Sequence, residues 1–164
     1  MRMKLCVPLV LMFCVAAIPA HAAVVVSFAH ADRYTDAGRF TLDSRHVLAE
    51  LEQHLKRLGE RLLPPYETLS IEVLDVDLAG DDRAIQRNGA DVRVLKGTAD
   101  WPSITLRYTL EAQGKTLQRR EETVSDMNYL MRTDNRYSQE ALPYEKRMLD
   151  TWFKARFVRQ ESAR

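Results

Sequence analysis

Residues 44–78 read SRHVLAELEQHLKRLGERLLPPYETLSIEVLDVDL, in which a helical pattern is followed by a strand pattern. Apolar residues recur every three or four positions through the first half, which predicts one buried helical stripe. Its members are Val47, Leu48, Leu51, Leu55, Leu58 and Leu62. Asp43 or Ser44 is a suitable N-cap, and we expect the helix to end at Pro64-Pro65, because proline interrupts helical hydrogen bonding.

The second half of the stretch predicts a strand over residues 69–78 whose apolar face changes partway along. The two apolar sets differ in parity, and they are Leu69, Ile71 and Val73, then Leu74, Val76 and Leu78. Because strand side chains alternate with a period of two, such a change of phase requires an irregularity. We therefore expect a β-bulge near Val73-Leu74 or a strand end that leaves the core.

Shorter patterns on either side predict the remaining elements. A β-branched run at 24–28 reads as a first strand, and a short strand is expected around residues 92–95. Alternating residues predict a half-buried strand at 104–110, and the polar segment 116–124 is its charged edge partner. A closing helix follows, with Pro143 in its first turn and an apolar stripe formed by Met148, Leu149, Trp152, Phe153 and Phe157.

This order of elements, β-α-β-β-β-β-α, predicts an α+β fold in a single domain. We expect a mainly antiparallel sheet with the two amphipathic helices packed on one of its faces. A split β-α-β variant, in which the first two strands run parallel around the first helix, stays open as an alternative.

The first 22 residues have the three parts of a signal peptide. A cationic start at 1–4 precedes an apolar run at 5–18, and Ala20-His21-Ala22 supplies an A-x-A cleavage site. The run is shorter than the ~20 residues that cross a bilayer, and no other long apolar stretch follows, so no membrane span is predicted. We expect cleavage after Ala22 and a domain at 23–164 that works in the periplasm or is secreted.

Charge and cysteine content exclude two classes of function. Lys and Arg number 24 against 23 Asp and Glu, whereas a protein that binds nucleic acid electrostatically needs a strong basic surplus. Cys6 and Cys14 are the only cysteines and both lie in the predicted leader. The mature domain is therefore expected to have neither a disulfide nor thiol chemistry.

One acidic cluster is a candidate metal site. Its members are Asp75, Asp77, Asp81 and Asp82. Residues 75–80 begin like a calcium loop, with acids at the first and third positions and Gly80 at the sixth. The pattern then fails, because Ala79 and Gln86 stand where the fifth and twelfth ligands belong. We interpret the cluster as a solvated strand end and turn, and no cofactor is predicted. A bound divalent cation is the alternative.

The histidines of the first predicted helix and the basic residues of the closing helix are interpreted as structural features, not as functional sites. His46 and His54 are too far apart on one helix to share a metal ion, and the i, i+4 spacing of Glu50 and His54 predicts a surface pair. The closing helix carries basic residues beside its apolar stripe, which predicts a cover helix with a favourable Asp150–Lys154 pair. Docking of that helix on an anionic surface would require its apolar side chains to face solvent.

Four strings of sequence together resemble a family of exported bacterial proteins, the domain of unknown function 3016. The strings are Arg33-Tyr34-Thr35-Asp36, Leu74-Asp75-Val76-Asp77-Leu78-Ala79-Gly80, Ser125-Asp126-Met127-Asn128-Tyr129-Leu130, and Tyr144-Glu145-Lys146-Arg147-Met148-Leu149-Asp150-Thr151-Trp152-Phe153. They run from the start of the predicted mature chain to its last helix, so the resemblance covers essentially all of it.

The resemblance implies a signal-bearing envelope protein and no particular reaction. It points to seven positions within the family motifs: Asp75, Asp77, Asp126, Tyr129, Glu145, Lys146 and Trp152. One interpretation is a structural network in which Glu145 and Lys146 pair with polar groups from the strand end and the Asp126 turn, since a buried charge needs such partners.

The sequence therefore favours a non-enzymatic binding module for an envelope partner, either a protein or a polymer. The alternative is a metal-dependent, hydrolase-like enzyme that uses Asp75 and Asp77 together with Asp81 or Asp82, with Asp126 or Glu145 brought near by folding. Scattered acids, or acids paired with Arg or Lys, would argue against the enzyme.

Overall fold

The computed structural model describes residues 22–38, 43–80, 93–97, 99–131 and 135–158. Its main elements are β1 (Ala23–Phe28), α1 (Ser44–Leu62), β2 (Glu67–Asp77), β3 (Ser103–Ala112), β4 (Lys115–Ser125) and α2 (Pro143–Phe157). Two 3-10 turns, η1 (Ala31–Arg33) and η2 (Asn135–Tyr137), complete the described elements. The predicted leader falls almost wholly outside the described residues, so its cleavage stays a prediction.

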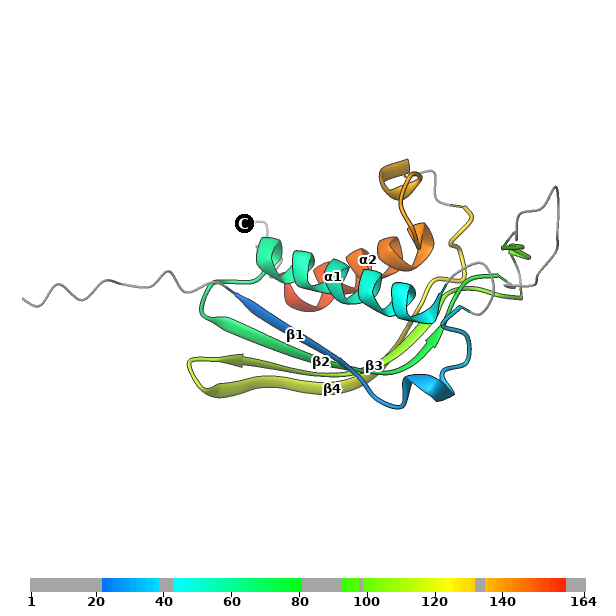
Figure 1. The fold of residues 1–164 in the computed structure, drawn as a ribbon. Helices are drawn as coiled ribbons and strands as arrows, with labels where there is room; N and C mark the ends of the chain where they lie inside the picture. The colour runs from blue at the N-terminus through cyan, green and yellow to red at the C-terminus, as the bar shows by residue number, and fades with distance from the viewer. Residues whose placement is uncertain (1–21, 39–42, 81–92, 98, 132–134, 159–164) are drawn as a thin grey trace, which may run out of the picture.

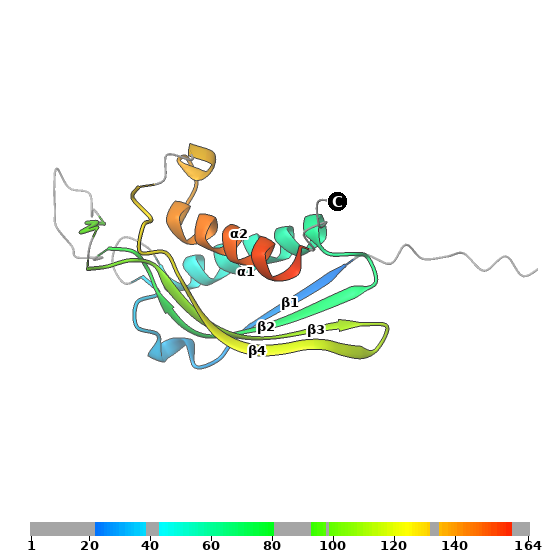
Figure 2. The ribbon, with the colours of Figure 1, turned by 180° about the vertical axis from the view of Figure 1, so that it is seen from behind.

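The four strands form one mixed sheet in the order β1-β2-β3-β4. β1 pairs with β2 in parallel, and the other two pairings are antiparallel. Helices α1 and α2 lie side by side on one face of this sheet, and no described helix covers the opposite face (Figure 1 and Figure 2). The α+β class, the mainly antiparallel sheet and the one-sided helices are confirmed. The first two strands do run parallel around α1, but they are direct neighbours and not split by a third strand.

Only residues 93–95 of the short strand expected around residues 92–95 are described, and they belong to no strand of the sheet. Val92 lies outside the described residues, and Val94 makes only one isolated bridge. The Lys96 amide donates to Asp100 Oδ2 at 2.7 Å, and Gly97 has a φ of +73°. A local side-chain acceptor thus takes the Lys96 amide that a strand partner would otherwise bind. Among the described residues the order is β-α-β-β-β-α.

The predicted bulge in β2 is present. The register with β3 passes from Val73↔Leu106 directly to Asp75↔Thr105, which leaves Leu74 without a partner. The extra residue, Leu74, shifts the phase so that Val76 and Leu78 join the same buried core as Val73. The change of phase in the sequence and the bulge in the sheet are thus the same feature.

Helix α1 packs closely on β1 and ends as predicted. Asp43 is its N-cap and accepts a hydrogen bond from the Arg45 amide at 2.9 Å. At Gly59 a Cβ atom would overlap the side chain of Val24 on β1. Glycine at this position therefore permits a close approach of helix and strand that any other residue would prevent.

Helix α2 begins at Pro143 and turns its aromatic side chains toward the sheet. Met148, Trp152 and Phe153 are all buried. Attachment to an anionic surface through these side chains is thereby contradicted, because they form core and do not face solvent. No helix in the described ranges is long and apolar enough to cross a bilayer. β4 is the charged edge strand that the sequence predicts.

Candidate functional site

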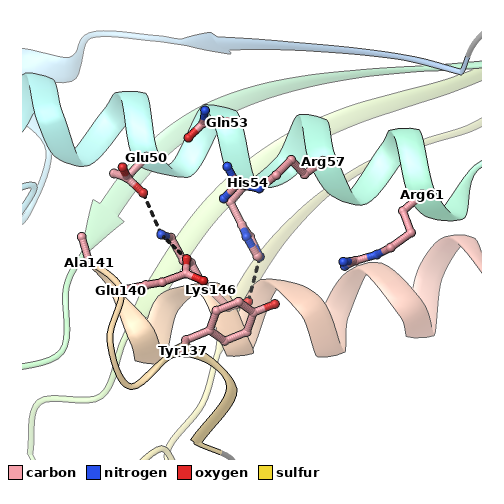
Figure 3. A pocket seen from close by; sticks show the side chains of 9 residues that line it. All are labelled: Glu50, Gln53, His54, Arg57, Arg61, Tyr137, Glu140, Ala141 and Lys146. Atoms are coloured by element: carbon pink, nitrogen blue, oxygen red, sulfur yellow. Dashed lines mark hydrogen bonds and ion pairs between the residues drawn. The ribbon is translucent and has the colours of Figure 1, made fainter.

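A polar pocket of about 560 Å³ lies between α1 and the chain that leads into α2 (Figure 3). It is lined by Glu50, Gln53, His54, Arg57, Arg61, Tyr137, Glu140, Ala141 and Lys146. Its volume is in the range of small-molecule binding sites, ~300–1,000 Å³. Most of its lining side chains are charged or carry hydrogen-bonding groups, so it suits a polar ligand.

The wall supplied by α1 follows from helix geometry. Glu50, His54, Arg57 and Arg61 are spaced by four, three and four residues, so they share one face of the helix. This stripe runs beside the apolar stripe that packs on the sheet. The opposite wall comes from Tyr137, Glu140 and Ala141 before α2, and from Lys146 near its start.

A buried histidine and a buried aspartate hold the floor of the pocket. His54 Nε2 lies 2.9 Å from Asp150 Oδ1 and 3.1 Å from the backbone oxygen of Lys146. Both partners are acceptors, so we assign the proton to Nε2, which donates to them. Nδ1 then keeps its lone pair, and it has no hydrogen-bond partner in the part of the chain that the structure describes.

Asp150 also accepts a hydrogen bond from the Tyr137 hydroxyl at 2.8 Å. Burial tends to raise the pKa of Asp150, but the hydrogen bonds from His54 and Tyr137 outweigh it and hold that pKa below its usual value. Burial, together with the bond to Asp150, raises the pKa of Tyr137 to about 12. At neutral pH the site therefore contains an ionised Asp150 and a neutral phenol.

Lys146 is buried between two carboxylates at one end of the pocket. Its Nζ lies 2.7 Å from Glu50 Oε2 and 3.0 Å from Glu140 Oε2 (Figure 3). Only 2% of the Lys146 side chain is exposed, so the ammonium needs these partners. The hydrogen bond from Lys146 lowers the pKa of Glu50 despite its partial burial.

Arg57 and Arg61 of α1 differ from Lys146 in their partners. Arg57 and Arg61 are both exposed, and neither makes a hydrogen bond or an ion pair with any residue that the structure describes. Lys56, by contrast, lies 2.6 Å from Glu52 on another side of the same helix. The lining thus has two guanidinium groups without a hydrogen bond or ion pair to a described residue and one ammonium held by two carboxylates, and the charge of Arg57 also lowers the pKa of Glu50.

Most of the positions named by the family motifs serve packing in other parts of the molecule. Glu145 is fully buried and accepts from the Ala79 amide at 3.0 Å and from Arg93 at 2.6 Å. Tyr129 is also fully buried, and its hydroxyl donates to Asp100 at 3.1 Å. Trp152 donates from Nε1 to Glu122 on β4 at 3.1 Å.

The proposed network around Glu145 and Lys146 is only partly present. Glu145 does bind the backbone that follows β2, as the network requires. Lys146 lies instead against α1 and Glu140. Asp126 Oδ1 accepts from the Asn128 amide at 3.1 Å, within its own turn.

Of the acids in the candidate metal cluster, Asp75 has a structural role in the described part of the chain. Asp75 accepts two hydrogen bonds of 2.7 Å from Thr35, one from its amide and one from its hydroxyl. Burial, and then the charges of Asp36 and Asp75, raise the pKa of Asp77. Asp81 and Asp82 lie outside the described residues. Within the described ranges, no three His, Cys, Asp or Glu side chains are placed to hold a metal ion.

The surface pair expected of Glu50 and His54 is wrong. His54 is 3% exposed and bonds to Asp150, while Glu50 bonds to Lys146. A signal was available, because His54 lies between Leu51 and Leu58 at the spacing of the apolar stripe. Asp150 likewise lies between apolar neighbours of α2 and bonds across the helices to His54, while the charge of Lys154 also lowers its pKa, as expected of a favourable pair.

A family model described as "Protein of unknown function (DUF3016)" matches residues 22–155. The chain belongs to the DUF3016 family. This DUF3016 match spans all four strands, α1 and most of α2, and it includes every residue that lines the pocket. No match is found among curated proteins.

Proposed function

We propose that this DUF3016 chain is an exported, non-enzymatic module that binds an envelope component in the pocket between α1 and α2. The observation that carries the proposal is that His54 and Lys146 are held in place before any ligand arrives. Asp150 holds His54, and two glutamates hold Lys146. Such preorganisation lowers the entropic cost of binding, because few side chains must be ordered by the ligand.

The character of the lining supports binding more than reaction. It contains no serine, threonine or cysteine among the residues described, and its phenol, Tyr137, already donates to Asp150. The imidazole of His54 and the ammonium of Lys146 are both engaged in bonds that join the two helices. What the pocket offers a ligand is charge and hydrogen-bonding groups in fixed positions.

Two observations support export. The first 22 residues have the order of a signal peptide, and the family match begins at residue 22, where cleavage is expected. Expression of the full chain in a bacterium with two membranes, followed by fractionation and intact-mass measurement, tests this. We expect a periplasmic protein that begins at Ala23. A cytoplasmic protein that keeps residues 1–22 would reject export.

Thermal unfolding tests the binding function. The probes are soluble saccharide and peptide fragments released from purified cell envelopes. A fragment that binds only the folded state raises the unfolding midpoint, by ~2.7 kcal/mol of stabilisation at a hundredfold excess over its Kd. Gln53 is exposed on the wall, so Gln53→Trp narrows the pocket without changing the core. We expect a rise in the wild type that Gln53→Trp removes; a rise of equal size in both would reject the pocket as the site.

A further inference from the structure

We infer that the ligand is an acidic saccharide whose oxyanion group, a carboxylate or a phosphate, is held by Arg57 and Arg61. The inference rests on the proposed function and adds the chemical class of the ligand. It starts from the charged groups of the lining, where Lys146 has two carboxylate partners, whereas Arg57 and Arg61 make no hydrogen bond or ion pair with a described residue.

The two arginines are placed to act together. They lie four residues apart on one face of α1, which is a rise of ~6 Å along the helix. Like charges at this spacing repel each other and weaken an isolated helix. Arg61 lies in the last turn, where its positive charge interacts favourably with the helix dipole, whereas Arg57 lies before that turn. An unbalanced pair that lines a pocket is accounted for by an anion that joins them.

Guanidinium groups fit this role by their shape. Each presents a planar fork of N–H donors that matches the two oxygens of a carboxylate or phosphate. The positive charge of Arg61 also acts on the Tyr137 phenol across the pocket and opposes the rise in its pKa. The guanidinium of Arg61 therefore acts on the interior of the pocket.

The other end of the pocket excludes a second anion. Glu50 and Glu140 place two carboxylates around the single ammonium of Lys146, which leaves one negative charge in excess. That end repels anions and accepts hydrogen bonds from hydroxyl groups. A ligand with its oxyanion at one end and hydroxyls along its length matches both ends.

A saccharide matches the remainder of the lining. Gln53, Glu140 and the Nδ1 atom of His54 offer donors and acceptors to sugar hydroxyls. Tyr137 supplies an aromatic ring, which stands edge-on to His54 with ring centroids 5.5 Å apart. Ala141 is the one aliphatic lining residue that is described, so the pocket offers little to the apolar side chains of a peptide.

Calorimetric titration of the chain, as purified from the expressing cells, tests the inference. The probes are glucuronate, glucose 6-phosphate, inorganic phosphate and neutral glucose. Arg57→Gln with Arg61→Gln removes the proposed contacts. Arg45→Gln with Lys56→Gln is the matched control, since it removes two positive charges from α1 at exposed positions outside the pocket.

We expect an acidic sugar to bind more tightly than glucose, with a Kd that rises at least about tenfold in the pocket variant and stays within about twofold in the control. Binding of glucuronate alone would identify the oxyanion group as a carboxylate. Binding of glucose 6-phosphate and inorganic phosphate would identify it as a phosphate. Equal losses in both variants, or no preference over glucose, would overturn the inference.

The same experiment separates this inference from the function it rests on. Suppose that glucose or an envelope fragment binds, that Gln53→Trp abolishes this binding, and that Arg57→Gln with Arg61→Gln does not. The pocket is then a binding site, but the oxyanion assignment is wrong. If neither the sugars nor the envelope fragments bind in a way that depends on Gln53, both proposals are wrong.

Discussion

The Nε2 atom of His54 lies 2.9 Å from Asp150 Oδ1, and this buried bond joins two helices whose residues are 96 positions apart in sequence. It holds α1 against α2 directly beneath the pocket, so it sets the separation of the pocket walls. Because both side chains are nearly inaccessible to water, neither has an alternative partner in solvent.

Removal of one partner should therefore be costly. We expect Asp150→Ala to lower the free energy of unfolding by about 3 kcal/mol, because it leaves His54 and Tyr137 without their acceptor. Urea denaturation measures the change. Asp32→Ala, at a side chain that is 80% exposed, should stay within about 0.5 kcal/mol. Equal effects of the two variants would contradict the structural role of the buried bond.

The stability of the protein should depend on pH through the same aspartate. The pKa of Asp150 lies below its usual value of 3.8 in the folded state, so its contribution is complete above that value and is lost as the pH falls through the folded-state pKa. We expect the free energy of unfolding to fall between about pH 5 and pH 3, and to fall less steeply in Asp150→Asn. Identical slopes in the two proteins would show that another group controls the acid transition.

Asp77 should behave in the opposite way. Its pKa is raised by burial and by neighbouring carboxylates, so its ionised form disfavours the folded state at neutral pH. Asp77→Asn should therefore stabilise the protein at pH 7, with the gain vanishing below about pH 4. Asp75→Asn is the matched comparison, because it weakens two bonds to Thr35 and should destabilise by about 1 kcal/mol. Destabilisation by Asp77→Asn at pH 7 would contradict this assignment.

The framework of the fold was predictable from sequence because its signals are periodic. The stripe from Val47 to Leu62 defines α1, and the change of parity after Val73 locates the bulge in β2. Both follow from backbone geometry, which acts locally. The turn at residues 96–97 was missed because a side-chain acceptor, Asp100, replaced a strand partner there, and a short apolar run does not reveal this.

The pocket was not predictable, because it depends on contacts between distant segments. Glu50 and His54 form an ordinary helical pair in sequence, yet their partners are on α2. Family resemblance directed attention to Glu145, Tyr129 and Trp152, whose described contacts hold loops, sheet and α2 together. Lys146 is the one motif position that lines the pocket.

The close contact of α1 with β1 gives a further prediction. Gly59→Ala raises helix propensity, but its Cβ overlaps the side chain of Val24, so we expect a net loss of about 1–2 kcal/mol in unfolding free energy. Val24→Ala combined with Gly59→Ala should lose less than the sum of the two single changes, since the smaller residue makes room. If the losses of unfolding free energy in the two single variants add up to the loss in the double variant, the two side chains do not restrict each other's size.

The pocket between α1 and α2 is proposed to bind an envelope component. The most direct test of this proposal is to titrate envelope saccharide fragments into isotope-labelled protein and record the amide chemical shifts. We expect saturable changes at Gln53, Arg57, Arg61 and Tyr137, and none at Arg107 and Arg119 on the sheet face opposite the helices. Changes confined to the sheet face, or no saturable change at any pocket residue, would contradict it.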